Sequence, residues 1–492
     1  MLHTPLHAYQ KHQSGLCVFL IAVTASTIQL SHPGPSQKEG GLGTIDNEPP
    51  LSQSRNLQVS QNQTIFDPDP NHLWNRLHNQ FYLRTAWDGR TYGGDVLDPL
   101  LWRETEYLLS GPSHEQAIRV LDEFLSTNAE GLIIDPLKRA LLQRDLWAVF
   151  DWLCDTTSKH QPGRKELERK LAQVIQRLAL TPDQVRSLPN TYSAAIASKA
   201  FATGYDPDRH ETPFLPPDLF RPNGPWVCLG QSGDVSGAPV HTSFFSGRSL
   251  FLVFMRLPGG RDATLAYLKQ LTDYPKPLVP NSGNYTITRD PRGISSVGTN
   301  APLVLNPDLP QFPSGTQVAL VRRMMLIDSH GELSSTGVTE SVQIRVFLAI
   351  PSREEWLSGH AGDLEDSFEF RLSRSQLFAG QSGGLRAVAK DAREFSQFLA
   401  HPFDLLEIRP NSPSSPSTST DKLRGRILNS CTSCHEAPGI HSLLATRMMF
   451  GSRGPEFPGL YDCSSSLTDQ ASGTIEWKHR QYNWGLLEGL WK

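Results

Sequence analysis

The spacing of apolar residues changes near residue 205, and this change constrains the fold more than any other feature of the sequence. Before it, apolar side chains recur at the spacing of amphipathic helices over three stretches, 113–129, 135–154 and 164–180. Helices of this kind bury their apolar faces against one another. The sequence therefore predicts an all-helical domain over residues 71–205.

Strand-like patterns dominate residues 206–408. Residues 249–257 form a nearly continuous apolar run, and residues 316–328 and 339–350 have the pattern of two strands joined across a turn that contains Gly331. Strands outnumber helices in this region. The sequence therefore predicts an α+β, β-rich domain here.

A Ser- and Pro-rich stretch precedes the end of the chain. Residues 409–421 contain nothing that can enter a core, so they predict a linker. The chain has 492 residues, enough for several domains, and residues 422–492 are expected to form a small all-α domain. We therefore predict a multidomain protein in which an all-α helical domain, an α+β domain and a small all-α domain follow one another.

The N-terminal residues have the layout of a secretory signal peptide. A polar stretch with Lys11 precedes a mostly apolar run over 16–25, which ends in small residues suited to cleavage. We expect residues 1–25 to be a signal peptide, with an uncleaved anchor as the alternative. Residues 26–70 are rich in Ser, Pro, Gly, Gln and Asn and predict a disordered spacer. The protein is expected to be exported to the periplasm or the cell surface.

Charge and hydropathy bear on the partners of the chain. The 46 basic and 50 acidic residues give a net charge of −4, which offers no electrostatic argument for nucleic acid. After the leader, no stretch approaches ~20 consecutive apolar residues. No stable membrane span is therefore expected once the signal peptide is removed.

Five consecutive residues near the C-terminus carry the clearest chemistry. Cys431-Thr432-Ser433-Cys434-His435 is a C-x-x-C-H sequence. On a helical turn the two thiols share one face, so both can add to the vinyl groups of one porphyrin, and the next imidazole can reach its iron. The motif and its surroundings, residues 422–492, resemble a monohaem c-type cytochrome domain.

The resemblance implies that the cofactor is haem c. Cys431 and Cys434 would carry the thioethers, and His435 would be the axial ligand of the iron. Covalent attachment of this kind takes place outside the cytoplasm, which agrees with the leader. In such domains a Gly-Pro carbonyl often accepts a hydrogen bond from the axial histidine, and residues 454–455 or 438–439 are the candidates.

The sixth position of the iron has several candidate ligands. A methionine is frequent there in c-type cytochromes, and Met448 and Met449 are the only methionines after the motif. They lie closer to the motif than is usual for this family. His441, His479 or an open position are the alternatives.

Zinc is the main alternative to haem. A tetrahedral site of sulfur and nitrogen ligands could draw on Cys431, Cys434 and Cys463 with His435, His441 or His479. Structural zinc sites usually pair two half-sites, and Cys463 has no close cysteine or histidine to form the second. The sequence therefore favours haem over zinc.

Two further patterns in the sequence could carry chemistry. Residues 380–384 match G-x-S-x-G, the pattern of a hydrolase nucleophile, with Ser382 as nucleophile, Asp391 or Glu394 as acid and His401 as base. These residues lie closer together in the sequence than in hydrolases with this motif. The sequence therefore favours a flexible loop here. No second metal site is expected, because four scattered histidines do not stand at the spacing of metal-binding motifs. These are His72, His78, His210 and His241.

These patterns favour an exported haem protein that transfers electrons to or from a redox partner protein. A haem-dependent oxidoreductase whose α+β domain binds substrate is one alternative, and a haem sensor or scaffold without turnover is another. No catalytic residue is assigned.

Overall fold

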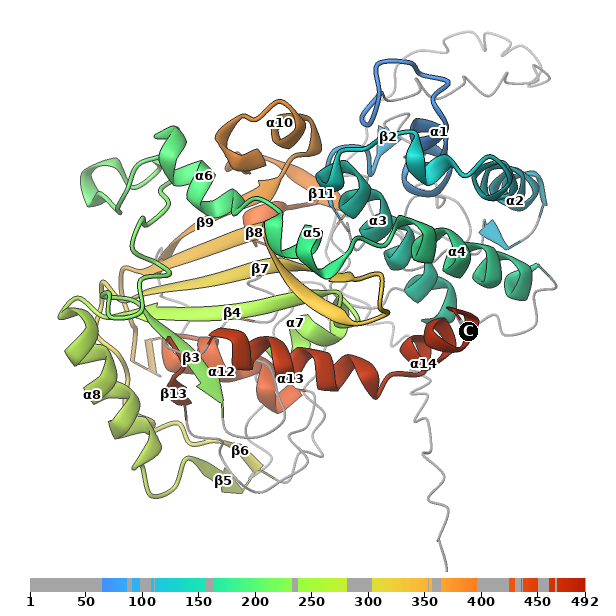
Figure 1. The fold of residues 1–492 in the computed structure, drawn as a ribbon. Helices are drawn as coiled ribbons and strands as arrows, with labels where there is room; N and C mark the ends of the chain where they lie inside the picture. The colour runs from blue at the N-terminus through green and yellow to red at the C-terminus, as the bar shows by residue number, and fades with distance from the viewer. Residues whose placement is uncertain are drawn as a thin grey trace, which may run out of the picture. The chain divides into compact units, whose positions relative to one another are not determined.

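A seven-stranded antiparallel sheet is the central element of the computed structural model (Figure 1). Its strand order is β10-β9-β8-β7-β4-β3-β13. The described residues belong to one compact unit, Val59–Lys492. They are residues 64–85, 91–97, 108–109, 111–155, 163–231, 238–280, 303–352, 354–355, 364–395, 424–429, 435, 437–449, 460–464 and 467–491.

The strands of the central sheet come from distant parts of the chain. They are β3 (Val227–Gln231), β4 (Ser249–Arg256), β7 (Gln317–Ile327), β8 (Leu333–Phe347), β9 (Glu365–Leu372), β10 (Leu385–Ala387) and β13 (Leu460–Asp462). Three small two-stranded sheets consist of β1 (Arg84–Thr85) with β2 (Thr91–Tyr92), β5 (Leu278–Pro280) with β6 (Leu303–Leu305), and β11 (Arg393–Phe395) with β12 (Arg424–Arg426).

Helices precede, interrupt and follow the strands. The first group comprises α1 (Leu73–Tyr82), α2 (Gly111–Ser126), α3 (Pro136–Asp155), α4 (Arg164–Leu178), α5 (Pro182–Ser187) and α6 (Thr191–Ser198). The second comprises α7 (Pro239–Phe244), α8 (Gly260–Thr272), α10 (Arg374–Phe378), α12 (Ile440–Met449), α13 (Leu467–His479) and α14 (Tyr482–Trp491).

The central strands match their predictions. β4 coincides with the apolar run at 249–257, and β7 and β8 form the predicted hairpin. Gly331 lies in its turn with φ of 83°, a conformation that glycine adopts without steric cost. The register of the two strands shifts beside Arg323, which marks a bulge.

Alternate residues of β4 face opposite sides of the sheet, and each side has its own core. On one side Leu250 and Leu252 join a large cluster with helices α1 to α4, α13 and α14. On the other side Phe251 and Val253 join a smaller cluster with α8 and α12. Helices therefore cover both faces of the sheet, in three layers.

Helix α3 is buried on nearly all sides. The three helices expected from apolar spacing are confirmed as α2, α3 and α4. In α3, however, Arg144 and Asp151 are as fully buried as Leu142. Gln143 Nε2 donates to the backbone oxygen of Ile327 in β7 at 2.7 Å. Helix α3 thus lies between the other helices and the sheet.

The last residues of the chain belong to the same core. Strand β13 pairs antiparallel with β3 at the edge of the sheet. The Trp484 ring of α14 packs edge-on against Trp147 of α3, with centroids 6.4 Å apart. Lys478 of α13 forms an ion pair with Asp151 of α3.

The predicted fold class is therefore wrong. We expected an all-α domain, an α+β domain and a small all-α cytochrome c-like domain in succession. Instead, described residues of all three regions share one large core, and the central sheet combines strands of the second region with one strand of the last. The physical reason is that apolar spacing reports which face an element buries, and does not report what covers that face.

Several predicted segments cannot be compared with the structure. The signal peptide 1–25, most of the spacer 26–70 and the linker 409–421 lie outside the described residues. Residues 64–70 of the spacer are described. Among them Phe66 is buried, and its ring packs edge-on against Trp74 of α1.

Candidate metal centre

His435 is the described residue of the C-x-x-C-H motif, and the two cysteines lie outside the described residues. His435 precedes helix α12. The helix start is fixed by Gln311, whose side-chain oxygen accepts the N–H of Ile440 at 2.9 Å. Gly439 has φ of 58°, and a Cβ there would overlap the same oxygen, so this position needs glycine.

Two reciprocal hydrogen bonds orient His435. Its Nδ1 lies 2.6 Å from the backbone oxygen of Ser442, and the Ser442 hydroxyl donates to the backbone oxygen of His435 at 2.8 Å. A carbonyl oxygen can only accept, so Nδ1 carries the proton. The lone pair of the neutral ring is then on Nε2, the arrangement of a metal-binding histidine with an oriented ring.

The carbonyl acceptor differs from the one the resemblance implied. Of the two candidate dipeptides, residues 454–455 lie outside the described residues. Residues 438–439 lead into helix α12, and Ser442, one turn further on, supplies the carbonyl. Its role could not be read from the sequence, because it depends on how α12 begins.

Arg345 of β8 connects this arrangement to the sheet. Its guanidinium forms a bidentate ion pair with Glu365 of β9. It also donates to the Ser442 hydroxyl at 2.9 Å and to the backbone oxygen of His435 at 3.5 Å. The position of His435 is therefore set by a planar cation that two strands hold in place.

A second histidine lies beside His435. His241 is on helix α7, which contacts α12. The centroids of the two imidazoles are 6.3 Å apart, and the ring planes are almost parallel, at 7°. His241 also packs against Phe251 of β4 with a centroid distance of 5.4 Å. The sequence offered no signal for this pair, because the residues are far apart in the chain.

Both imidazoles are neutral at physiological pH. Burial, together with the positive charge of Arg345, lowers the pKa of His435 to about 4, although the bond to Ser442 opposes this shift. Burial, followed by the influence of His435 and of Arg322, lowers the pKa of His241 to about 3. Neutral imidazoles keep the lone pair that a metal ion requires.

The sixth-ligand candidates from the sequence occupy different places. Met448 and Met449 form the last residues of α12, about 9 Å along the helix axis from Ser442. His441 is the second residue of the same helix. His479 ends α13, where its exposed ring stacks on Trp484 at 5.2 Å, in the cluster on the opposite face of the sheet from α12.

The third cysteine of the zinc alternative faces another cysteine. Cys463 follows β13 and lies opposite Cys228 of β3, and its N–H donates to the Cys228 backbone oxygen at 2.9 Å. A hydrogen bond with Cys463 and burial raise the pKa of the Cys228 thiol well above its usual value. Among the described residues, no cluster of three or more His, Cys, Asp or Glu side chains could hold a metal ion.

The G-x-S-x-G segment forms a tight turn. Ser382 and Gly383 have φ of 47° and 59°, and a Cβ on Gly383 would overlap the backbone oxygen of Thr191. The turn is followed by strand β10, whereas a nucleophile elbow is followed by a helix. The base candidate His401 lies outside the described residues. The segment therefore serves close packing against α6.

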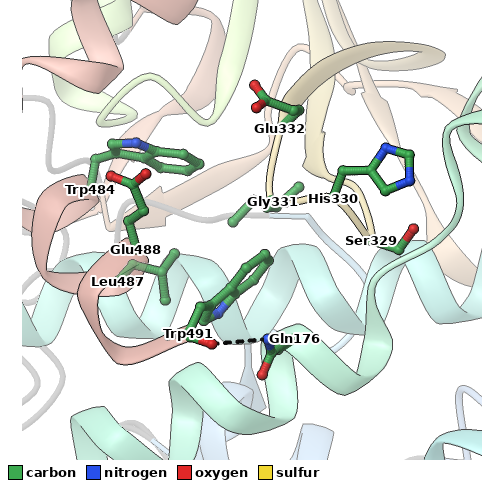
Figure 2. Close-up of a pocket in the computed structure, with 10 residues that line it drawn as sticks. Gln176, Ser329, His330, Gly331, Glu332, Trp484, Leu487, Glu488 and Trp491 are labelled. Atoms are coloured by element: carbon green, nitrogen blue, oxygen red, sulfur yellow. Dashed lines mark hydrogen bonds between the residues drawn. The ribbon is translucent and has the colours of Figure 1, made fainter.

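A shallow pocket of about 230 Å³ lies where α14 meets α4 and the β7–β8 turn (Figure 2). Trp484 and Trp491 flank it, and His330 lies on the opposite wall. Gln176 Nε2 donates to the backbone oxygen of Trp491 at 3.2 Å, and Trp491 Nε1 donates to Ala172 at 3.0 Å. These bonds dock the C-terminal helix, so the pocket is the margin of a packing contact, away from His435.

Within the part of the chain that is described, none of the helices combines the length and the apolarity needed to cross a membrane. No protein-family model, no curated protein and no solved structure matches this chain.

Proposed function

We propose that this chain carries one covalently bound c-type haem at Cys431, Cys434 and His435 and that it transfers electrons. The observation that carries the proposal is the orientation of His435. Its Nδ1 donates to the Ser442 carbonyl, which leaves the lone pair on Nε2, the atom that would bind the iron. Haem iron bound in this way supplies reversible one-electron redox chemistry.

The surroundings of His435 support a fixed metal ligand. Arg345 and Ser442 hold its backbone oxygen, so the imidazole keeps its place without help from the cofactor. Ile440 and Leu444 of α12 join the apolar cluster on this face of the sheet. Apolar surroundings exclude water from a redox centre and contribute to its potential.

Export belongs to the same proposal. Thioether attachment of haem takes place outside the cytoplasm, and the first 25 residues resemble a signal peptide. We therefore place the protein in the periplasm or on the cell surface, where a second redox protein would exchange electrons with it.

The test is haem content after maturation of the full chain in an exporting host that attaches c-type haem. A pyridine haemochrome assay on denatured protein is expected to find one covalently bound haem per chain. Replacing both motif cysteines by Ser is expected to abolish it, while Cys154→Ser, at the end of α3, retains it. Wild-type protein without covalent haem, but with one zinc per chain by elemental analysis, would overturn the proposal.

The choice between electron transfer and catalysis has its own readout. An electron-transfer haem is expected to be reduced and reoxidised reversibly and to bind no carbon monoxide in the reduced state, because both axial positions are occupied. Rapid carbon monoxide binding by the wild-type protein would instead support the oxidoreductase or sensor alternatives.

A further inference from the structure

We propose that His241 of helix α7 is the sixth ligand of the haem iron, an inference that depends on the proposed haem site. The ligand would then come from a region of the chain far upstream of the C-x-x-C-H motif. The observation behind it is the pairing of two nearly parallel imidazoles on contacting helices.

The spacing of the two rings fits a shared metal ion. A metal–nitrogen bond is about 2 Å long, and a ring centre lies about 1 Å from its nitrogen, so two imidazoles on opposite sides of one ion have centres about 6 Å apart. The centroids of His241 and His435 are 6.3 Å apart. Rings in face-to-face contact would be closer, because touching carbon atoms lie about 3.5–4.0 Å apart.

The surroundings hold His241 in this place. Helix α7 ends at Phe244, and the chain then turns back through Ser246 and Gly247 into β4, with the Gly247 N–H donating to the Thr242 backbone oxygen at 2.9 Å. Phe251 of β4 packs against the His241 ring. A ligand on a short helix tied directly to the central sheet needs little ordering when it binds.

The alternatives fit less well. Ser442 lies on the Nδ1 side of His435, so the sixth ligand must approach from the Nε2 side. Met448 and Met449 are on the helix that provides Ser442, and about two turns beyond it. His479 belongs to the layer on the other face of the sheet.

The test uses the axial-ligand spectrum of full-length, haem-loaded protein. Ferric wild-type protein is expected to give the low-spin electron paramagnetic resonance and near-infrared magnetic circular dichroism of bis-histidine ligation. His241→Ala is expected to lose this signal, to become high-spin and to gain carbon monoxide binding at least tenfold. Added imidazole is expected to restore the low-spin spectrum of the variant.

Three further variants serve as controls. His441→Ala and Met448→Leu with Met449→Leu are expected to keep the bis-histidine spectrum. His241→Met preserves side-chain volume and is expected to give histidine–methionine ligation, so it remains informative if His241→Ala folds poorly. The haemochrome assay is run on each variant, which separates loss of the ligand from loss of the haem.

Two results would overturn the inference while leaving the proposed function intact. One is covalent haem with a histidine–methionine spectrum in the wild-type protein. The other is an unchanged low-spin spectrum in both His241 variants. Absence of covalent haem from the wild-type protein would refute the proposed function itself.

Discussion

Asp151 is expected to be one of the most sensitive positions for stability. Its Oδ2 accepts hydrogen bonds from Arg248 Nη1 and from Lys478 Nζ, both at 2.8 Å. All three side chains are fully buried. They belong to α3, to the residue before β4 and to α13, so one carboxylate connects three distant parts of the chain. Asp151→Asn would leave two cations in the core without this negative charge.

Removing one partner of a buried ion pair typically costs about 3–5 kcal/mol. Unfolding of a chain this size has an entropy of about 1 kcal/mol/K, at about 2.1 cal/mol/K per residue, so the midpoint of thermal unfolding should fall by about 4 °C. Lys478→Met leaves Asp151 paired with Arg248 and should lower the free energy of unfolding by less than Asp151→Asn does. The double variant should cost less than the sum of the two, because it removes one of the stranded charges.

Thermal unfolding followed by circular dichroism, with all variants prepared in the same way, measures these differences. The matched control is Lys269→Ala, which breaks an ion pair to Asp273 whose side chains are 76% and 59% exposed. That substitution should cost under about 0.5 kcal/mol. If Asp151→Asn lowers the midpoint no more than the control, helix α13 is not docked on α3 as described.

Two other predictions concern a thiol pair and a carboxylate. In protein from an oxidising compartment, Cys228 and Cys463 are expected to form a disulfide, because they lie opposite each other where β3 pairs with β13. The two thiols give two protons and two electrons to an external disulfide, so the mass of the protein falls by two hydrogens. Alkylation of both thiols in unfolded, unreduced protein would contradict this prediction. Burial alone would raise the pKa of Asp95, but hydrogen bonds from Ser375 and from the Ser373 hydroxyl lower it overall, so its contribution is complete above about pH 4 and is lost as the pH falls through the lowered pKa. Asp95→Asn should therefore lower the free energy of unfolding by about 1 kcal/mol at pH 7, and this difference should shrink as the pH falls through the lowered pKa, measured by denaturant unfolding; a difference independent of pH would refute this.

Local patterns in the sequence predicted individual elements well. The run at 249–257 and the alternation on either side of Gly331 correspond to β4 and to the hairpin, because each pattern reflects burial within one element. The assembly of these elements was not predictable in the same way. Arg144 and Asp151 of α3 are charged residues, a type rarely buried, yet they are buried through ion pairs with side chains from other elements.

The candidate metal centre was likewise predictable only in part, where its residues are neighbours in the sequence. The motif at 431–435 is visible in the sequence because its three candidate haem-binding residues are nearly adjacent and their spacing has a geometric meaning. The hydrogen bonds that Ser442 and Arg345 make with His435 form only in the folded chain. No other potential metal ligand stands at a metal-binding spacing from His241 in the sequence. Its approach to His435 therefore depends on the contact between α7 and α12.

The pairing of β13 with β3 has a consequence for biosynthesis. Strand β13, which completes this edge of the sheet, is translated long after its neighbour β3. Until then one side of β3 presents unsatisfied backbone groups, which favour association with other chains. Truncation before residue 460 would therefore remove a protective strand, and the shortened product should aggregate.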